Sequence, residues 1–291
     1  MRKKYLIPLL AALFVSACNS GEKGAQALLR RAEAAYEAGL YQKSIALIDS
    51  LKKSYPKAFD SRRQGQELVR KATLADQTEN LQFLDSVLNE KRTLLAQVKK
   101  EYLFEKDTAY QQLGLYYHPS QQLEKNLHRS HLSFRVNERG ELVMTSIYCG
   151  KQSIHHYGVR VTAPDATYME TPSAKETYES SIMGEQIEKS DFRIGEDGGV
   201  MEFIYHHAGE NLKVQFQGEK SYTTTMSASD RQALVAVYDL AQLLDFIYQM
   251  EQEREACYVK IRFIKNQLEG EKGQIKGREA QIEDKAPQRE E

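Results

Sequence analysis

Hydrophobic residues recur every seven positions in two separate stretches of the chain. The first register consists of Leu74, Leu81, Leu88, Leu95 and Tyr102, with Leu84 and Val98 in a partial second register. The second register consists of Leu240, Ile247, Arg254, Ile261, Leu268, Ile275 and Ile282, joined at a three-residue offset by Leu243, Met250, Cys257 and Ile264. Apolar residues at a sustained seven-residue spacing, with charged residues between them, predict two long, coiled-coil-like helices. These helices are expected over residues 66–112 and 227–283.

Both predicted helices carry further signals. Ser227, with Asp230 three residues on, fits a capping box that starts the second helix. Asp85, Lys91 and Arg254 interrupt the apolar registers, and we expect them to fix the helix register at a cost in stability. We expect the two helices to pair antiparallel within one chain, as a stalk, because this avoids the cost of association. The open alternative is a homodimer.

Between the two helices, residues 113–226 alternate between apolar and polar side chains. Leu132, Phe134 and Val136 alternate with polar residues, as do Leu212, Val214 and Phe216. Such alternation is typical of strands with one buried face. Further predicted strands are Leu142 to Cys149, Tyr157 to Thr162, Ala166 to Glu170, Phe192 to Ile194, Val200 to His206 and Tyr222 to Thr225. Short Gly- and Asn-containing turns between them predict antiparallel neighbours, in a sandwich or a strongly bent sheet.

Residues 26–65 are rich in strong helix formers and are broken at Gly39. Together with Pro56, which ends the second helix, this predicts a helical hairpin. Ala32, Gly39, Tyr41, Ser44 and Pro56 occupy positions that resemble a tetratricopeptide repeat. No second repeat follows, so we expect the hairpin to pack on the next helix, near Leu68, Val69 and Ala72.

The chain begins with the pattern of a targeting signal. Arg2, Lys3 and Lys4 precede an apolar stretch that is too short to span a bilayer. The following Val15-Ser16-Ala17-Cys18 resembles the lipobox of bacterial lipoproteins, and this resemblance implies cleavage after residue 17 and acylation of Cys18. We expect residues 18–25 to form a flexible tether. We expect residues 284–291 to form a disordered tail.

Charge and hydropathy exclude two classes of protein. The 40 cationic and 41 acidic side chains nearly balance, so the chain lacks the basic footprint of a nucleic-acid binder. Its mean hydropathy of −0.60 excludes a protein with many membrane spans. Removing residues 1–17 would take away three cations and give a net charge of −4, so we expect membrane attachment to rest on the acyl chains.

Candidate chemistry is sparse. His155 and His206 belong to a repeated His-His-x-Gly pattern on two predicted strands. If those strands pair, the two imidazoles could converge on a metal, with Cys149, Glu202 or Asp165 as further ligands. We expect instead that these histidines lie at strand ends and bind no metal. Cys149 and Cys257 are expected to be two buried thiols rather than a disulfide. We therefore predict no metal, no other cofactor and no catalytic residue.

Two further patterns have a structural and a functional interpretation. The segment Asp197-Gly198-Gly199 lacks the alternating carboxylates of a calcium loop, which favours a hairpin turn. The strand-rich region also holds several tyrosines, which could form a stacking surface for a glycan or peptide but more often pack in a core. They are Tyr148, Tyr157, Tyr168, Tyr178, Tyr205 and Tyr222. Sequence motifs of hydrolases, zinc proteases and nucleotide-binding proteins are absent from the chain.

Together these patterns predict an α+β protein in which a helical hairpin and two long helices flank an antiparallel β-rich domain. The layout resembles lipoproteins of Gram-negative bacteria that have no assigned activity. We expect a non-enzymatic binding or scaffold protein, anchored by lipid in the cell or outer membrane and facing the periplasm. Its expected partner is an envelope protein or a glycan. The alternatives are a metal-dependent enzyme using His155 and His206, and a dimeric coiled-coil spacer.

Overall fold

The computed structural model describes residues 15–182 and 184–283 of the chain. It is a mixed α+β protein with two antiparallel sheets, which confirms the α+β part of the predicted fold class. The chain divides into two compact units. Unit 1 comprises residues 1–86 and 252–291, and unit 2 comprises residues 87–251. Both long helices therefore contribute to both units. Most of the predicted signal peptide and the predicted tail lie outside the described residues.

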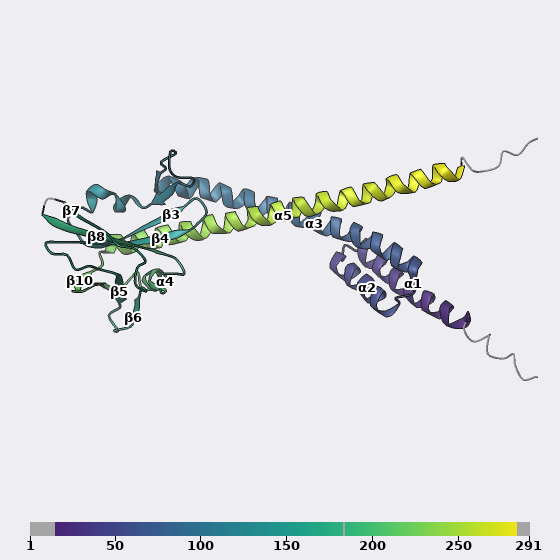
Figure 1. The fold of residues 1–291 in the computed structure, drawn as a ribbon, viewed down its shortest axis with the longest axis horizontal. Coiled ribbons are helices and arrows are strands. Elements are labelled where there is room, and N and C mark those ends of the chain that lie inside the picture. The colour runs from purple at the N-terminus through teal and green to yellow at the C-terminus, as the bar shows by residue number, and fades with distance from the viewer. Residues whose placement is uncertain (1–14, 183, 284–291) are drawn as a thin grey trace, which may run out of the picture. The chain divides into compact units, whose positions relative to one another are not determined.

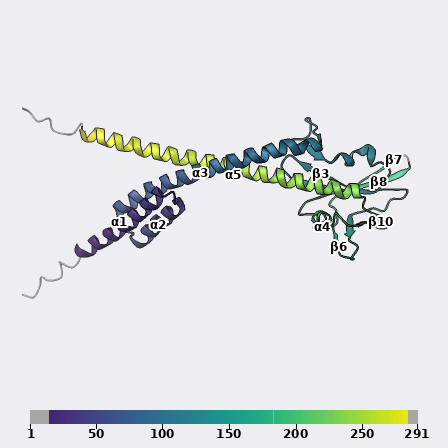
Figure 2. The same ribbon diagram turned by 180° about the vertical axis from the view of Figure 1, so that it is seen from behind.

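Unit 1 contains the predicted helical hairpin. Helices α1 (Val15–Glu37) and α2 (Tyr41–Ser54) lie side by side in both views (Figures 1 and 2). The turn between them uses Gly39 at a φ of 73°, which glycine adopts without strain. The Ser44 hydroxyl donates to the Ala32 carbonyl at 2.8 Å across the buried interface. Leu68 of the next helix joins the hairpin core, with Val69 packed against it, as expected.

The structure corrects the flexible tether predicted for residues 18–25. These residues belong to α1, and its side chains from Glu22 onward contact the rest of the hairpin. Ala25 is fully buried, and the Tyr55 ring packs so closely on Gly24 that a Cβ there would lie 2.5 Å from its hydroxyl. The Ser61 hydroxyl donates to Glu22 at 2.6 Å. These contacts stabilise a helix that the small and polar sequence did not predict.

The first long helix, α3, runs over Phe59–Val98 rather than 66–112. A 3-10 turn at Lys99–Glu101 ends it, and Tyr102 is already extended, with φ −114° and ψ 153°. The next residues form β1 (Leu103–Glu105), which pairs with β2 (Leu115–Tyr117). The prediction extended the helix too far because the segment has no proline or glycine, whereas its aromatic residues complete a sheet instead.

The second long helix, α5 (Ala228–Glu283), begins where the capping box placed it. The Asp230 amide donates to the Ser227 hydroxyl at 3.0 Å. In unit 1, Asn80 donates to the Cys257 sulfur at 3.2 Å. Arg254, also in unit 1, lies 3.4 Å from Asp85. Two of the residues that interrupt the heptads therefore pair with each other.

Unit 2 contains two antiparallel sheets. The six-stranded sheet has the order β1-β2-β3-β4-β8-β7, and the four-stranded sheet has the order β10-β9-β5-β6. The strands not yet given are β3 (His131–Asn137), β4 (Leu142–Gly150), β5 (Gly158–Thr162), β6 (Tyr168–Glu170), β7 (Tyr178–Ile182), β8 (Glu185–Arg193), β9 (Lys213–Gln217) and β10 (Tyr222–Thr225). The predicted alternation of Leu132, Phe134 and Val136 is confirmed, since all three are buried in the core of unit 2.

The segment predicted as a strand over Val200 to His206 is helix α4 (Val200–His206). Val200, Met201 and Ile204 are its buried residues, at helical rather than strand spacing. The preceding Asp197-Gly198-Gly199 segment is the start of this helix and not a hairpin turn. Gly199 is the N-cap at a φ of 82°, and the Asp197 carboxylate accepts from the Met201 amide at 2.7 Å.

Within the described residues, α5 is the one helix long and apolar enough to span a membrane, with a mean hydropathy of 1.2 over its best window in Ala228–Gly270. Leu234, Val237 and Leu240 of this helix are buried in the core of unit 2. Because a buried core helix has the same composition, the hydropathy of α5 is weak evidence for a membrane span.

Candidate functional site

The outer face of the six-stranded sheet is hollowed. A cavity of about 220 Å³ lies over β3, β4 and β8, and residues 117–131 form part of its wall. A second hollow of about 1,020 Å³ adjoins it, walled by residues 172–178. Arg135 and Lys189 line both hollows, so the two share a cationic border.

Strand alternation places these side chains on the outer face. Leu132, Phe134 and Val136 point into the core, so the intervening residues Ser133 and Arg135 point away from it. Register then aligns the outward residues of neighbouring strands. His131 lies opposite Ile147, and Ile147 lies opposite Lys189. The wall of the cavity is thus set by pairing of strands that are far apart in sequence.

The segment covering one side of the cavity is fixed to the start of α5. Arg129 makes a two-pronged ion pair with the buried Asp230 carboxylate, at 2.8 and 2.7 Å. The Gln121 side-chain amide also donates to Asp230, at 3.2 Å. Asn126 closes the same segment by donating to the carbonyls of Ser120 and Gln122. These bonds preform the wall, which reduces the ordering cost of binding.

The cavity carries a net positive charge. Among the described residues, no carboxylate lies within ion-pair distance of Arg135 or Lys189, and Arg135 donates only to the Thr145 hydroxyl, at 3.1 Å. Burial lowers the pKa of His131, and the charges of Arg129 and Lys189 act in the same direction. The imidazole is therefore neutral near pH 7. Two cations remain to receive an anionic group.

Apolar side chains lie beside these cations. Ile147 and Ile187 line the cavity between the strands, while Leu123 and Leu127 line it from the covering segment. Leu123 and Leu127 are 68% and 53% exposed. The cavity therefore offers an anionic group and an apolar group separate surfaces. Cys149 also lines the cavity. Its thiol is a poor nucleophile, because burial and the carboxylate of Glu185 raise the pKa of Cys149.

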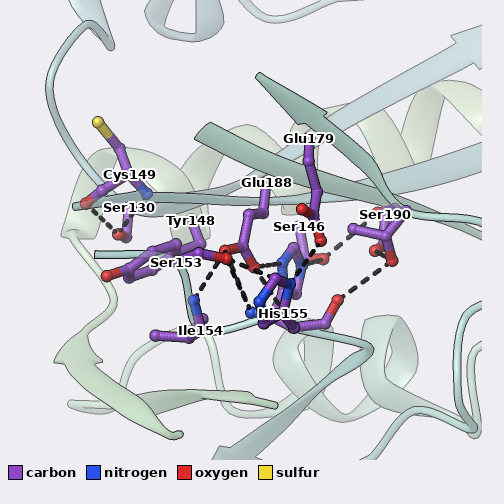
Figure 3. Close-up of polar contacts among 12 residues, drawn as sticks. Ser130, Ser146, Tyr148, Cys149, Ser153, Ile154, His155, Glu179, Glu188 and Ser190 are labelled. Atoms are coloured by element: carbon purple, nitrogen blue, oxygen red, sulfur yellow. Dashed lines mark hydrogen bonds and ion pairs between the residues drawn. The ribbon is translucent and has the colours of Figure 1, made fainter. Parts of the chain in front are cut away.

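The core face of the same sheet carries a buried polar network, drawn in Figure 3. The Ser146 hydroxyl lies 2.8 Å from His156 Nε2, and His156 Nδ1 lies 3.4 Å from Glu188. Glu188 also accepts from the amides of Ile154, His155 and His156, at 2.8, 3.1 and 2.6 Å. A serine, a histidine and a carboxylate joined in this order have the connectivity of a hydrolase triad.

Burial makes this network structural. Ser146, His156 and Glu188 are each at most 1% exposed, so no substrate reaches the hydroxyl. Burial alone raises the pKa of Glu188, but the hydrogen bonds from the His156 amide and the Ser153 hydroxyl outweigh it, so the pKa lies below its usual value. Burial lowers the pKa of His156 more than Glu188 raises it. A carboxylate anion thus fixes the loop before β5 by accepting its amides.

The structure does not bring the two predicted metal candidates together. His155 lies in the loop before β5 and contacts Glu179 at 3.1 Å. His206 is at the end of α4, 3.7 Å from Glu202. The expected convergence with His155 required both residues to lie on paired strands, and α4 is a helix. Asp165 accepts from Thr167 instead. No group of three or more potential ligands that could hold a metal ion occurs in residues 15–182 and 184–283.

The six tyrosines do not form one stacking surface. Tyr148 is buried and packs edge-on against Tyr222. Tyr205 stacks on Tyr238 of α5, and Arg160 covers Tyr168. Tyr157 and Tyr178 are exposed. Cys149 and Cys257 are both free thiols. Cys257 is buried as expected, whereas Cys149 is only half-buried and lines the cavity.

The sequence patterns do not mark Arg135 and Lys189 as site residues. The outward position of Arg135 follows from the alternation of β3, which was the available signal. The position of Lys189 depends on β8, only the end of which was predicted. Comparison with protein-family models, curated proteins and solved structures finds no match to this chain.

Proposed function

We propose that this chain is a lipid-anchored protein of a bacterial cell envelope, facing the periplasm, that binds a partner through the outer face of its six-stranded sheet. The observation that carries the binding role is the preformed cavity with Arg135 and Lys189 at its border. A partner that fits has a carboxylate or phosphate next to an apolar group. Both an envelope protein and an acidic glycan contain such groups.

The anchor and the stalk belong to the same proposal. The lipobox-like Val15–Cys18 segment supports acylation at Cys18. Antiparallel pairing of α3 and α5 is supported in unit 1 by the Asn80–Cys257 and Asp85–Arg254 contacts, and in unit 2 by the 2.6 Å Arg92–Glu251 ion pair. The long helices would then present the β-domain on a helical stalk. We favour binding over catalysis because the triad-like network is buried and the Cys149 thiol is protonated.

The anchor is tested by labelling cells with an alkyne-bearing palmitate. The wild-type chain should incorporate the label, and Cys18→Ser should not. Labelling of the serine variant, or a wild-type chain that stays unlabelled, would contradict the anchor.

The binding role is tested with a photoreactive residue at Leu127, on the cavity wall, in intact cells. We expect a cross-linked adduct that disappears when Arg135→Gln and Lys189→Gln are combined. A photoreactive residue at Tyr222, on the other sheet, is the matched control. An adduct that forms equally well without the two cations, or no adduct at all, would refute the proposed site.

A further inference from the structure

Unit 1 has a second cationic hollow, at the corner where α2 leads into α3. Its volume is about 490 Å³, and its lining consists of Lys52, Phe59, Arg62, Arg63, Gln66 and Arg70. Four of these six side chains are cationic and none is acidic. A hollow of this composition attracts an anion.

The local fold places these cations together. Arg62, Arg63 and Arg70 come from the first turns of α3, and Lys52 comes from the last turn of α2. The Arg62 guanidinium is held by its Nη1 donating to the Pro56 carbonyl at 2.6 Å. Its Nε atom is buried and has no hydrogen-bond partner among the described residues. A donor therefore remains to be satisfied at this corner.

The carboxylates that pair with Lys52 and Arg63 neutralise these two cations only weakly. Asp60 lies 3.9 Å from Arg63, and both side chains are more than 80% exposed. Asp49 lies 3.5 Å from Lys52. Exposed pairs of this kind contribute little and are screened by salt. Lys52 and Arg63 therefore keep most of their positive charge at this corner, although the mature chain has a net negative charge.

Phe59 adds an apolar element to the hollow. It is the first residue of α3, and 74% of its surface is exposed. An exposed aromatic ring beside lysines and arginines is typical of protein surfaces that lie in the headgroup region of a membrane. Phe59 is not among the residues of the hairpin core.

The corner lies next to the start of α1. Ser61 donates to Glu22, and Tyr55 packs on Gly24, so the α2–α3 junction contacts the first half of α1. Cys18 precedes Glu22 by four residues of the same helix, which is about 6 Å along its axis. An acyl chain at Cys18 would bring this corner to the membrane surface.

From this juxtaposition we infer that the hollow around Lys52, Arg62 and Arg63 binds the phosphate of an anionic phospholipid headgroup, with Phe59 entering the interface. This inference rests on the proposed lipid anchor at Cys18. It adds a second contact beside the acyl chains, and such a contact fixes the orientation of unit 1 at the bilayer.

The test uses the chain from residue 18 onward with Cys18→Ser, so that no acyl chain contributes. We expect it to co-sediment with phosphatidylglycerol vesicles and not with uncharged phosphatidylcholine vesicles. Combining Lys52→Gln with Arg63→Gln should weaken binding about 25-fold, at about fivefold for each cation removed. Phe59→Ser should weaken it about tenfold. The matched control is Lys260→Gln with Lys265→Gln, two exposed lysines of α5 in the same unit.

Three outcomes would overturn the inference. The first is that the protein does not bind anionic vesicles. The second is that the hollow variants and the control variant lose binding equally. The third is that the hollow variants lose binding to soluble polyglutamate but bind vesicles as well as the unsubstituted hollow does. The last result would assign the hollow to an acidic protein partner. Because the test protein has no acyl chain, failure here leaves the Cys18 labelling result unaffected, and failure of labelling leaves the vesicle result interpretable.

Discussion

At the scale of single residues, the buried network of unit 2 shows how burial decides the role of a side chain. Ser146, His156 and Glu188 have the residue types and connectivity of catalytic groups, yet each is almost completely buried. Glu188 is satisfied by three backbone amides and the Ser153 hydroxyl, at 2.6 Å for the hydroxyl. Its charge therefore stabilises a loop, and removing one partner would leave a costly unsatisfied group.

The lowered pKa of His156 predicts a loss of stability in mild acid. In the unfolded chain its pKa returns towards 6.5, so below that pH the unfolded state binds a proton that the folded state does not. The free energy of unfolding therefore falls as the pH drops through this range, and His131 acts in the same direction.

This pH dependence can be measured as urea midpoints at about pH 7.5 and about pH 5.5. His156→Gln should reduce the difference between the two midpoints. His206→Gln, which changes an exposed imidazole on α4, is the control and should leave that difference unchanged. An unaltered difference in the His156 variant would contradict the assignment of a neutral buried imidazole.

Arg135 and Lys189 predict selectivity for the charge of a ligand. Octanoate should bind the purified chain, whereas octylammonium, with the same apolar tail and the opposite charge, should not. Combining Arg135→Gln with Lys189→Gln should weaken octanoate binding about tenfold or more, because charge-assisted bonds contribute about 1.5–3 kcal/mol each. Isothermal titration calorimetry measures both affinities.

The control for the octanoate experiment is Lys213→Gln with Lys220→Gln, which removes the same charge from the four-stranded sheet and its connecting turn. Similar octanoate affinities in both double variants would show that overall charge, and not the cavity, determines binding.

At the scale of elements, the sequence predicted those whose pattern and end signals agree. β3 and β9 show clean alternation, and Ser227 with Asp230 marks the start of α5. The segment Val200 to His206 failed because its apolar residues fit both a strand and a short helix. Only its packing and the left-handed Gly199 distinguish the two. The start of α1 and the end of α3 depend on tertiary contacts, namely Tyr55 on Gly24 and the pairing of β1 with β2.

The candidate site was less predictable than the fold. Its hollow exists because strand register aligns His131, Ile147 and Lys189 from three strands, and no local pattern specifies register across separate strands. Its wall depends on Arg129 reaching Asp230 about a hundred residues away in sequence. The alternative in which His155 and His206 converge lacks support for the same reason, since it assumed a pairing of two strands, one of which is helix α4.

The Arg254–Asp85 pair leads to a prediction about helix stability. Arg254 interrupts an aliphatic register, its Nε is buried without a partner among the described residues, and its partner Asp85 is half-exposed. Arg254→Leu should therefore raise the free energy of unfolding by about 1 kcal/mol, because a pair this exposed contributes little and the buried donor is removed.

Chemical denaturation followed by circular dichroism measures the effect of Arg254→Leu. Arg92→Leu, at the Arg92–Glu251 pair whose arginine is more exposed than Arg254, is the control and should change stability little. Marked destabilisation by Arg254→Leu would show that the pair itself holds the helices in register.

At the scale of the whole molecule, the two units predict separate responses to core mutations. Leu51 is fully buried in unit 1 and Met144 is fully buried in unit 2. Leu51→Ala should cost about 2–5 kcal/mol of packing energy and accelerate amide exchange in α1 and α2. Exchange in β3, β4 and β8 should stay unchanged, and Met144→Ala should give the reverse pattern. Hydrogen-exchange mass spectrometry measures both, and uniform acceleration in either variant would contradict independent units.

The division of the chain also bears on the order in which it matures. Unit 2 is one uninterrupted run of residues, whereas unit 1 needs both the start and the end of the chain. As the polypeptide emerges from the ribosome, unit 2 can fold before the last segment of unit 1 has been made. Its folding then joins the two long helices at their inner ends and shortens the loop that unit 1 has to close. Folding of the β-domain can thus favour the pairing of the helices on either side of it.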